Sequence, residues 1–418
     1  MSIHRWWPLA AASIGASALT LAAQIAVAAP APPFSELLRQ TQTTAPRLAE
    51  AQAAIGEAQG NAAQARARPN PSVAVEVENW GGSKQYQGFT TTETTARFEQ
   101  PFELGGKRSA RIAAGDAGVA AAQARAGLGG GDFAFDLAAA YAVAEAAELR
   151  LQLAQDSVAL AQEDARIAGA LVKAGKEADL RAVQAASAVE ASRAGVDAAR
   201  AERADAFARL SALAGATEPY TSIPVSLLVH ADRIETPAAP DPMKSPAYRA
   251  ALAERDAAAA RATVEKTRAT LDLTAGIGVR RFAAEDVTAL VGGISMPLPL
   301  FDRNRGNIAA AHAALSGAEA RLAAARFDAQ ADVSAAISRA DAALSRISSA
   351  QASERSAAEA YRLVRIGYQA GKLGQLDVLN ARRMLLDARA QTINARLERL
   401  SAEAALARLN GVAPFGDI

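Results

Sequence analysis

Side chains that commonly catalyse reactions or bind metals are scarce in this chain of 418 residues. It contains no cysteine, which excludes disulfides, thiolate metal sites and cysteine nucleophiles. The three histidines, His4, His230 and His312, are far apart in the sequence, and we find no metal triad, nucleophile elbow or phosphate-binding loop. We therefore expect no enzymatic activity, no cofactor and no metal site.

The overall charge is balanced, with 45 lysines and arginines against 44 aspartates and glutamates. Both signs are interspersed, so the chain lacks the basic surface that is typical of a nucleic-acid-binding protein. The charges that could act together lie instead in segments where apolar and polar residues alternate.

Four such segments have the alternation and length of β-strands, at residues 72–80, 89–100, 271–280 and 287–296. A strand of this length crosses a bilayer when it is tilted. We expect the charged side to face a water-filled lumen, because a basic group facing lipid at mid-depth costs about 2–4 kcal/mol. The residues of this side are Glu76, Glu78, Glu93, Arg97, Asp272 and Arg280. The residues expected to face lipid are Val73, Val75, Val77, Leu271, Leu273, Ile277 and Val279.

Long helices are expected to position these strands, because 112 residues are alanine, the best helix former, and only 5% are aromatic. Residues 107–172 and 303–369 are each predicted to form a helix about 100 Å long. Each is followed by a turn and a returning helix of about 58 Å, at 176–214 and 372–410. Two shorter helices, at 34–68 and 245–268, are expected to stack end to end on the returning helices.

The first long helix contains a weak stretch, Gly127 and Gly129 to Gly131. Each glycine there costs about 1 kcal/mol relative to alanine. We expect the helix to stay continuous across this stretch, with a break as the alternative.

The chain is a tandem duplication, because three anchors repeat at one fixed offset of 196 residues. The matches are Pro101 with Pro297, Gly175 with Gly371, and residues 210–215 with 406–411. Each half is therefore predicted to contain a helix, two strands, a long helix, a turn and a returning helix.

The first 28 residues have the features of an export signal, with a short basic region, an apolar stretch and the cleavage pattern Ala26-Val27-Ala28. An N-terminal membrane anchor is the alternative. The remaining chain divides into a first repeat at 29–217, a linker at 218–245, a second repeat at 246–411 and a tail at 412–418. We expect the linker to run across the outside of the helices.

Four strands are too few for a closed barrel, whose known minimum is about eight. An open edge cannot lie in hydrocarbon, because its amides would have no hydrogen-bond partners. Several copies of the chain must therefore contribute strands. Two copies would give eight strands and three would give twelve, and the strand spacing does not choose between them.

The doubled plan of strands, proline corner and long helix resembles the TolC-type outer-membrane efflux proteins over essentially the whole mature chain. Residues 371–381, after the second turn, have the sequence pattern Gly-x-x-x-x-x-Asp-Val-Leu-Asn-Ala. Two corner segments, ELGGKR at 103–108 and PLPLFDRNRG at 297–306, are similar to the cobalt-zinc-cadmium (CzcC-type) branch.

The resemblance implies a mainly α protein with a transmembrane β-barrel part. The chain would form a homotrimer, with a twelve-strand barrel in the outer membrane and a tunnel of long helices in the periplasm. Its implied partners are a periplasmic adaptor protein and an inner-membrane, proton-driven (RND-type) pump. The cargo would be divalent heavy-metal cations, with selection in the pump and passive passage through this chain.

The resemblance also indicates a gate at the periplasmic end. In the family, an Asp-x-x-Asp sequence after the second turn forms acidic rings, and the matching residues here are Asp377 and Asn380. The amide removes half of the ring charge. At the 196-residue offset in the first repeat lie Arg181 and Gln184, and we expect Arg181 to pair with Asp377 of its own or a neighbouring chain. The residues expected to contact the adaptor are Gly175, Gly371, Lys173, Lys176, Gln369 and Lys372.

The sequence leaves other functions open. A multidrug or type I secretion duct would share every feature except the cargo. A periplasmic coiled-coil scaffold or adaptor would need the long helices but not hairpins of bilayer length.

Overall fold

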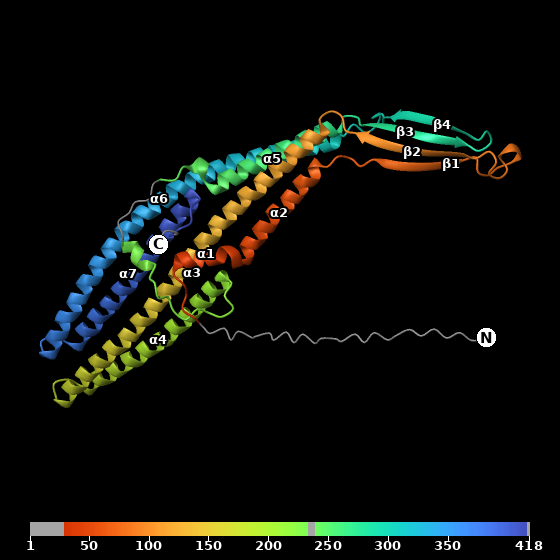
Figure 1. Cartoon of the computed structure of the whole chain (residues 1–418). Helices are drawn as coiled ribbons and strands as arrows, with labels where there is room; N and C mark the ends of the chain where they lie inside the picture. Colours follow the sequence, from red (N-terminus) through yellow and green to blue (C-terminus); the bar gives the residue numbers. More distant parts are fainter. Residues whose placement is uncertain (1–28, 233–238, 416–418) are drawn as a thin grey trace, which may run out of the picture.

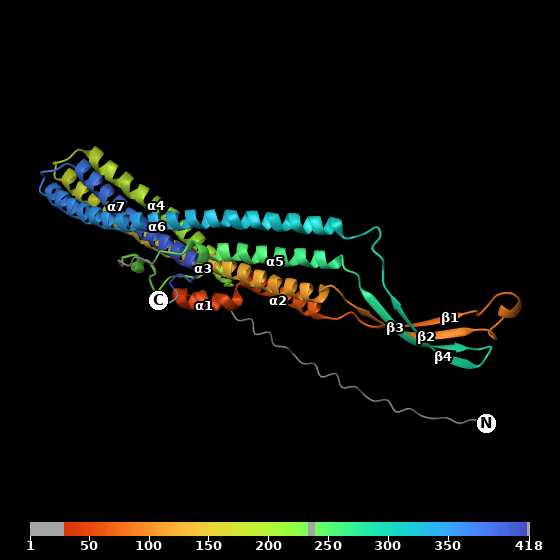
Figure 2. The same ribbon diagram turned by 90° about the horizontal axis from the view of Figure 1, so that it is seen from above.

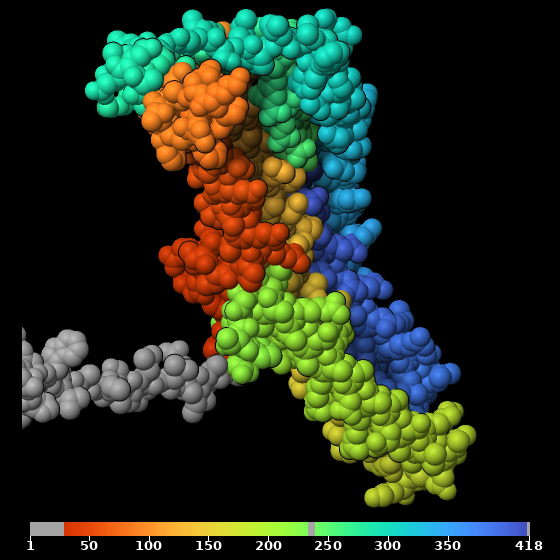
Figure 3. Space-filling model, turned by 90° about the vertical axis from the view of Figure 1, so that its right-hand side faces the viewer, coloured from red at the N-terminus to blue at the C-terminus, as the bar shows by residue number. Residues whose placement is uncertain are grey.

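The computed structural model of the chain describes residues 29–232 and 239–415. The predicted export signal at 1–28 and the last three residues of the predicted tail lie outside this part. The molecule is elongated, with a β-sheet at one end and the tips of two helical hairpins at the other (Figure 1). The space-filling view, turned so that the sheet end faces the viewer, shows the sheet at the top and a hairpin tip at the bottom (Figure 3).

The predicted order of elements occurs in both halves of the chain. The first half contains α1 (Phe34–Thr44), α2 (Pro46–Arg66), β1 (Ser72–Glu78), η1 (Lys84–Tyr86), β2 (Glu93–Phe102), α3 (Lys107–Lys173) and α4 (Asp179–Ala214). The second half contains α5 (Pro246–Arg268), β3 (Leu273–Phe282), β4 (Val287–Ser295), α6 (Arg305–Gln369) and α7 (Gln375–Asn410). Two short 3-10 helices, η2 (Leu228–Asp232) and η3 (Pro242–Lys244), lie between the halves. None of the described helices is both long and apolar enough to cross a membrane.

The four strands form one antiparallel sheet in the order β1-β2-β3-β4. Its register brings Val75 opposite Ala96, Ala96 opposite Val279, and Val279 opposite Leu290. Side chains alternate between the two faces of a strand, so these four residues share one face. Strands β1 and β4 each have one side without a partner in the described chain.

The bounds of the strands differ from those that the sequence predicts, and β2 and β3 each end two residues later. β1 has seven residues and stops at Glu78, because Asn79 adopts a left-handed conformation with φ 55°. β2 begins at Glu93 instead of Phe89, and β3 begins at Leu273. Leu271 therefore lies before the sheet and is not part of its apolar face.

The two long helices are continuous, and α3 runs through the glycine stretch at 127–131 without a break. Both end in the same turn, in which Gly175 and Gly371 have φ values of 68° and 70°. The amide of the residue after each glycine donates to a carbonyl five residues earlier, from Lys176 to Leu171 and from Lys372 to Gly367. This arrangement favours glycine, because a side chain would strain the left-handed backbone.

Two helix predictions are wrong in detail. The helix predicted at 34–68 is two helices, because Ala45 is extended and Pro46 starts a new helix as its first residue. The returning helices begin at Asp179 and Gln375, three residues later than predicted, because the turns at the tips take up those residues.

The short helices extend the line of the returning helices, as predicted from their lengths. α2 and α4 both pack along α3, and α5 and α7 both pack along α6. α5 also packs against α3, so it joins the two halves near the sheet (Figure 2). Further from the sheet, towards the hairpin tips, α3 packs against α7.

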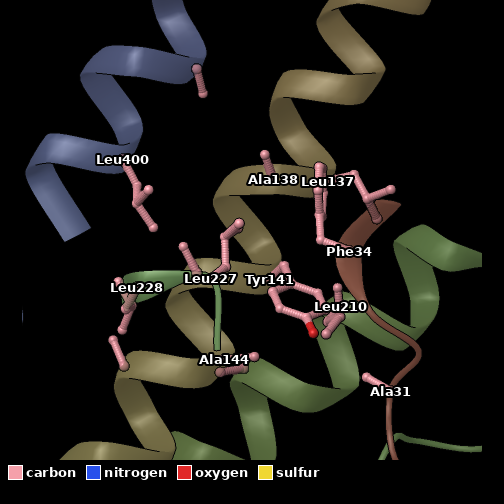
Figure 4. Packing of buried hydrophobic residues seen from close by; sticks show 14 of the residues in the cluster. Ala31, Phe34, Leu137, Ala138, Tyr141, Ala144, Leu210, Leu227, Leu228 and Leu400 are labelled. Atoms are coloured by element: carbon pink, nitrogen blue, oxygen red, sulfur yellow. The ribbon is translucent and has the colours of Figure 1, made fainter. Parts of the chain in front are cut away.

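The largest apolar core lies at mid-length, where part of the linker is buried. Leu227 and Leu228 are 3% and 2% exposed and pack with Tyr141 and Leu137 of α3 (Figure 4). The expectation that the whole linker lies outside is therefore wrong for the segment around η2.

Three polar residues on one face of α3 hold the linker. The hydroxyl of Tyr141 donates to the carbonyl of Val225 at 3.1 Å. The buried carboxylate of Glu145 accepts from the amides of Leu227 and Leu228 at 2.8 and 3.0 Å, and from the hydroxyl of Ser226. One turn further on, Glu148 accepts from the amide of Ile223 and from Arg203. The linker therefore has a fixed position on the first repeat.

We predict that Glu145→Ala releases this segment. The substitution leaves buried amides without an acceptor, which costs about 1–3 kcal/mol. Hydrogen exchange should show loss of protection at the amides of Leu227 and Leu228, with a lower midpoint of unfolding in urea. Glu190→Ala, which removes an exposed pair with Arg193, is the control and should leave both unchanged. Unchanged protection in Glu145→Ala would contradict the assigned role.

Candidate functional site

The polar face of the sheet brings five of the six predicted lumen residues together. The register places Glu76 opposite Thr95 and Thr95 opposite Arg280, so all three lie on one face. Arg280 forms ion pairs with Glu78 at 3.2 Å and Glu93 at 3.1 Å, and donates to the hydroxyl of Thr95. On the same face, Arg97 lies 3.8 Å from Glu99. This face therefore carries paired charges, with glutamates in excess.

The sixth predicted lumen residue, Asp272, lies elsewhere. It precedes β3 at the corner where the sheet meets the helices, and its carboxylate accepts from the amide of Leu104 at 3.3 Å. It also forms an ion pair with Lys107, the first residue of α3, at 2.7 Å. Asp272 therefore fixes the corner instead of lining the middle of the sheet.

The opposite face of the sheet is apolar and exposed. Val73, Ile277 and Leu290 are 73%, 70% and 87% exposed. A contiguous exposed apolar surface marks an interaction with another protein or a membrane. With Phe98 and Val279 beside them, these side chains form a surface suited to lipid.

The tips of the two helical hairpins carry the residues predicted to contact an adaptor. Lys173, Lys176, Gln369 and Lys372 are all exposed around the two glycine turns. Exposed apolar side chains lie close to them in the sequence, in the second tip turn and on the first turns of the returning helices. These are Leu180, Val183, Leu373 and Leu376.

The four predicted gate residues lie on the returning helices just beyond these turns. Asp377 and Asn380 are exposed on α7, and the carboxylate of Asp377 accepts from the amide of Gly374 at 2.9 Å. On α4, the guanidinium of Arg181 donates to Gln184 at 3.2 Å and lies 3.8 Å from Glu177. The predicted pairing of Arg181 with Asp377 therefore does not form within the described part of one chain. Pairing between two copies stays a prediction.

A different contact joins the two tips. The side chain of Gln375, at the start of α7, is buried and donates to the backbone carbonyl of Arg181 at 3.2 Å. Tyr368 is 1% exposed beside it. The tips are therefore connected through Gln375 and not through the predicted ion pair.

Polar contacts also run along the seam between α3 and α7, which are antiparallel. From mid-length towards the tips, the pairs are Asp132 with Arg408, Arg150 with Asn394, Asp156 with Arg389, and Asp164 with Arg382. Three of the four are an aspartate of α3 with an arginine of α7. The seam therefore connects the first repeat to the second along about half of α3.

The pair nearest the tips, Asp164 and Arg382, is the buried one. Its side chains are 3% and 10% exposed, and the atoms Oδ2 and Nη1 are 3.1 Å apart. Tyr361 of α6 donates to the other carboxylate oxygen at 3.3 Å. Beside the network, Arg365 lies 3.3 Å from Glu163. Three helices, α3, α6 and α7, therefore meet at one carboxylate.

Burial raises the pKa of Asp164 above its usual range, while Arg382 and Tyr361 act in the opposite direction. Burial and the neighbouring carboxylate raise the pKa of Tyr361 to about 12, so its hydroxyl keeps the proton that it donates. Removing one partner of such a buried pair leaves an uncompensated charge in the interior.

This network is not predicted from the sequence, because Asp164 is 197 residues from Tyr361 and 218 residues from Arg382. A signal for it is present. Asp164 lies in the buried stripe of Ala161, Ile167 and Ala168, and Arg382 lies in the stripe of Val378 and Leu385. A charged residue at a buried position of an apolar stripe needs a partner from another element.

Nothing in residues 29–232 and 239–415 brings three or more histidine, aspartate or glutamate side chains together as a metal site. His312 is exposed on α6, and His230 lies in η2 on the linker. The arrangement offers two surfaces, a polar and an apolar sheet face, joined to helical hairpins that are held together by buried charges.

Comparisons with known proteins agree with this geometry. The sequence model of the family "Outer membrane efflux protein" matches residues 37–216 and 243–412. The nickel-cobalt-cadmium resistance protein NccC of Alcaligenes xylosoxydans xylosoxydans is 42% identical over 326 residues, covering 78% of this chain and 74% of that protein. The nickel and cobalt resistance protein CnrC of Cupriavidus metallidurans is 42% identical over 78% of each chain. The cobalt-zinc-cadmium resistance protein CzcC of the same organism is 33% identical over 52% of this chain and 53% of that protein.

Among solved structures, the outer membrane protein VceC of Vibrio cholerae has the same fold. Its TM-score is 0.74 at 21% identity, with 91% of this chain and 96% of that chain covered. A membrane protein of Pseudomonas aeruginosa matches with a TM-score of 0.77 at 18% identity, over 92% of this chain and 91% of that chain. The resemblance seen in the sequence is thereby confirmed.

We predict that Asp164→Ala destabilises the helical region by about 3–5 kcal/mol, because it leaves Arg382 buried without a partner. The double replacement Asp164→Leu with Arg382→Met should recover most of this loss, since it removes both charges. Urea unfolding followed by circular dichroism measures both. Glu190→Ala, at an exposed pair, is the control, with an expected change below about 0.5 kcal/mol. If Asp164→Ala were no worse than this control, the buried network would not hold the hairpins together.

Proposed function

Because the chain belongs to the outer membrane efflux protein family, we propose that it is the outer-membrane channel of a tripartite pump that exports divalent heavy-metal cations. Family membership places the sheet in the outer membrane and the long helices in the periplasm. The cargo is proposed from one observation. The relatives that are 42% identical are named for resistance to nickel, cobalt and cadmium, or to nickel and cobalt.

The proposed channel is a homotrimer. The open sides of β1 and β4 need partners, since amides in hydrocarbon cannot bind water. Pairing β1 of one copy with β4 of the next closes a ring, and three copies supply a barrel of twelve strands. The helical layer has the same two free sides, α6 on one and α2 with α4 on the other. The same three copies would close both layers.

The proposed partners are a periplasmic adaptor protein and an inner-membrane RND pump. The two hairpin tips present lysines beside exposed apolar side chains such as Leu180 and Leu376. Apolar anchors with a polar rim are typical of a protein-binding surface. We assign the adaptor contact to these tips, through Lys173, Lys176, Gln369 and Lys372 around Gly175 and Gly371.

The proposed gate is a ring of Asp377 side chains, one from each copy, with Asn380 one turn further on. The ring would attract cations to the narrow periplasmic mouth. Arg181 and Gln184 lie on the other hairpin, so a contact between Arg181 and Asp377 of different copies would close the gaps between hairpins. The chain itself is a passive conduit, and we assign the selection of cargo to the pump.

Deletion of the gene should make the host more sensitive to nickel, cobalt and cadmium salts and leave its sensitivity to hydrophobic drugs unchanged. The physical reason is that export across the outer membrane stops when the conduit is missing. The minimal inhibitory concentration of each compound measures this, and the full chain on a plasmid should restore resistance. Increased sensitivity to drugs alone would instead support a multidrug duct.

We predict that Asp377→Asn removes block of the channel by divalent cations. The amide can still accept the hydrogen bond from Gly374, so the start of α7 is kept while the ring loses its charge. Single-channel conductance in planar bilayers, with cobalt added on the helical side, should fall in the native channel and stay constant in the variant. Glu190→Gln, far from the tips, is the control. Equal block in native and Asp377→Asn channels would remove the gate from this position.

A further inference from the structure

The corner between β4 and α6 carries an exposed apolar segment that the channel function does not use. Residues 296–304 form an open loop where the sheet meets the helices (Figure 2). Four of its side chains are large, apolar and exposed, and Phe301 is fully exposed at 100%. The other three are Met296, Leu298 and Leu300.

This segment continues the apolar face of the sheet beyond the end of β4. Leu290 and Ile294 lie on that face, and every second residue after them is apolar as far as Leu300. The intervening residues Pro297 and Pro299 have no amide hydrogen, so they end the ladder. A residue before proline favours an extended backbone, which maintains the alternation as far as Leu298. Beyond it the amide of Leu300 donates to the carbonyl of Leu298 at 2.9 Å, so the chain turns at Pro299. The lipid-suited surface therefore extends past the hydrogen-bonded sheet.

The same loop borders a hollow with basic side chains. A cavity of about 510 Å³ is lined by Leu298, Leu300 and Phe301 on one side and by charged residues on the other. The charged residues are Lys107, Arg268, Asp272, Asp302 and Arg303.

Of the three basic side chains that line this cavity, one has no acidic partner among the described residues. Lys107 pairs with Asp272, Arg268 pairs with Glu265, and the carboxylate of Asp302 accepts from the amide of Asn304. Arg303 donates only to the carbonyl of Pro299 at 3.4 Å and has no acidic partner among the described residues.

We propose that this corner binds a phospholipid of the periplasmic leaflet, with Arg303 at the phosphate and Leu298, Leu300 and Phe301 against the acyl chains. The inference depends on the outer-membrane location of the sheet, not on the cargo. Three features of the corner select this ligand. The apolar strip is continuous with the lipid-facing strands, the unpaired guanidinium complements an anionic headgroup, and the corner lies at the boundary set by strands of nine and ten residues.

The site also anchors the protein in the plane of the membrane. Apolar and aromatic side chains inserted beside basic residues hold a segment at the headgroup layer. With no cysteine in the chain, a thioether-linked lipid cannot supply this anchor. The corner would fix the depth of the barrel at the level where the helices begin.

Tryptophan quenching by brominated phospholipids tests the site. Trp80 is the only tryptophan after position 7, so Trp80→Phe gives a silent background for single tryptophans in the mature chain, from which the predicted export signal at 1–28 has been removed. Phe301→Trp tests the corner, Leu290→Trp on β4 is the positive control, and Phe327→Trp on α6 is the negative control; the last two native side chains are 87% and 69% exposed. The proteins are reconstituted in vesicles of phosphatidylethanolamine and phosphatidylglycerol brominated near the acyl carbonyl.

We expect quenching of Phe301→Trp comparable to that of Leu290→Trp, and none for Phe327→Trp. Adding Arg303→Gln should lower the enrichment of brominated phosphatidylglycerol over brominated phosphatidylethanolamine around Phe301→Trp about five-fold. The matched control, Arg326→Gln beside Phe327, should leave the enrichment unchanged.

The controls separate failure of this inference from failure of the channel. Quenching at Leu290 without quenching at Phe301 would overturn the lipid site while the sheet stays in the membrane, and would indicate that a neighbouring copy covers the corner. No quenching at Leu290 would overturn both the membrane position of the sheet and the site. Quenching at Phe301 with no effect of Arg303→Gln would overturn the role of Arg303 at the phosphate.

Discussion

The structure depends on one requirement, that every backbone amide of the sheet has a hydrogen-bond partner, because hydrocarbon supplies none. The two inner strands satisfy this within the chain, while β1 and β4 each keep one open side. A proline lies at one end of each open strand, Pro71 just before β1 and Pro297 just after β4. The open sides therefore end where the strands end, and the proposed closure by other copies would pair segments of seven and nine residues.

The same closure determines what the helices must do. Because β2 leads directly into α3 and β4 into α6, each hairpin of the sheet carries one long helix, and the helical layer inherits the order of the strands. Alanine lets these helices approach closely. It does little to fix the register of one helix on another, since its small side chain is the same at every position. The buried pair of Asp164 and Arg382 supplies specificity, because only one register of α3 on α7 compensates both charges.

The periodic parts of the chain were accessible from the sequence, and the contacts between distant parts were not. Alternation predicts the strands, and the shared offset of Gly175 and Gly371 predicts two equivalent turns, which the structure confirms. The break before Pro46 is marked in the sequence by the proline itself. The alanine-rich residues around it have no hydrophobic pattern that would distinguish two helices from one continuous helix. Asp272 was misplaced because the alternation in the sequence begins at residue 271, whereas the strand begins at Leu273 and Asp272 pairs with Lys107 at the corner. Asp164 was missed because its partners belong to the other repeat.

The charges on the polar face of the sheet are arranged so that cations could pass along it without being bound tightly. It carries four glutamates, at 76, 78, 93 and 99, against the two arginines at 97 and 280, so it attracts cations. Arg280 forms ion pairs with Glu78 and Glu93, and Arg97 lies beside Glu99. A cationic side chain therefore lies next to each of these three carboxylates. A dehydrated metal ion needs several oxygen ligands converging on one point. Conduction requires that an ion can leave as easily as it enters. If this face lines the proposed lumen, three of its four carboxylates are already paired with arginine, so it would draw hydrated cations in without a cluster of free carboxylates to retain them.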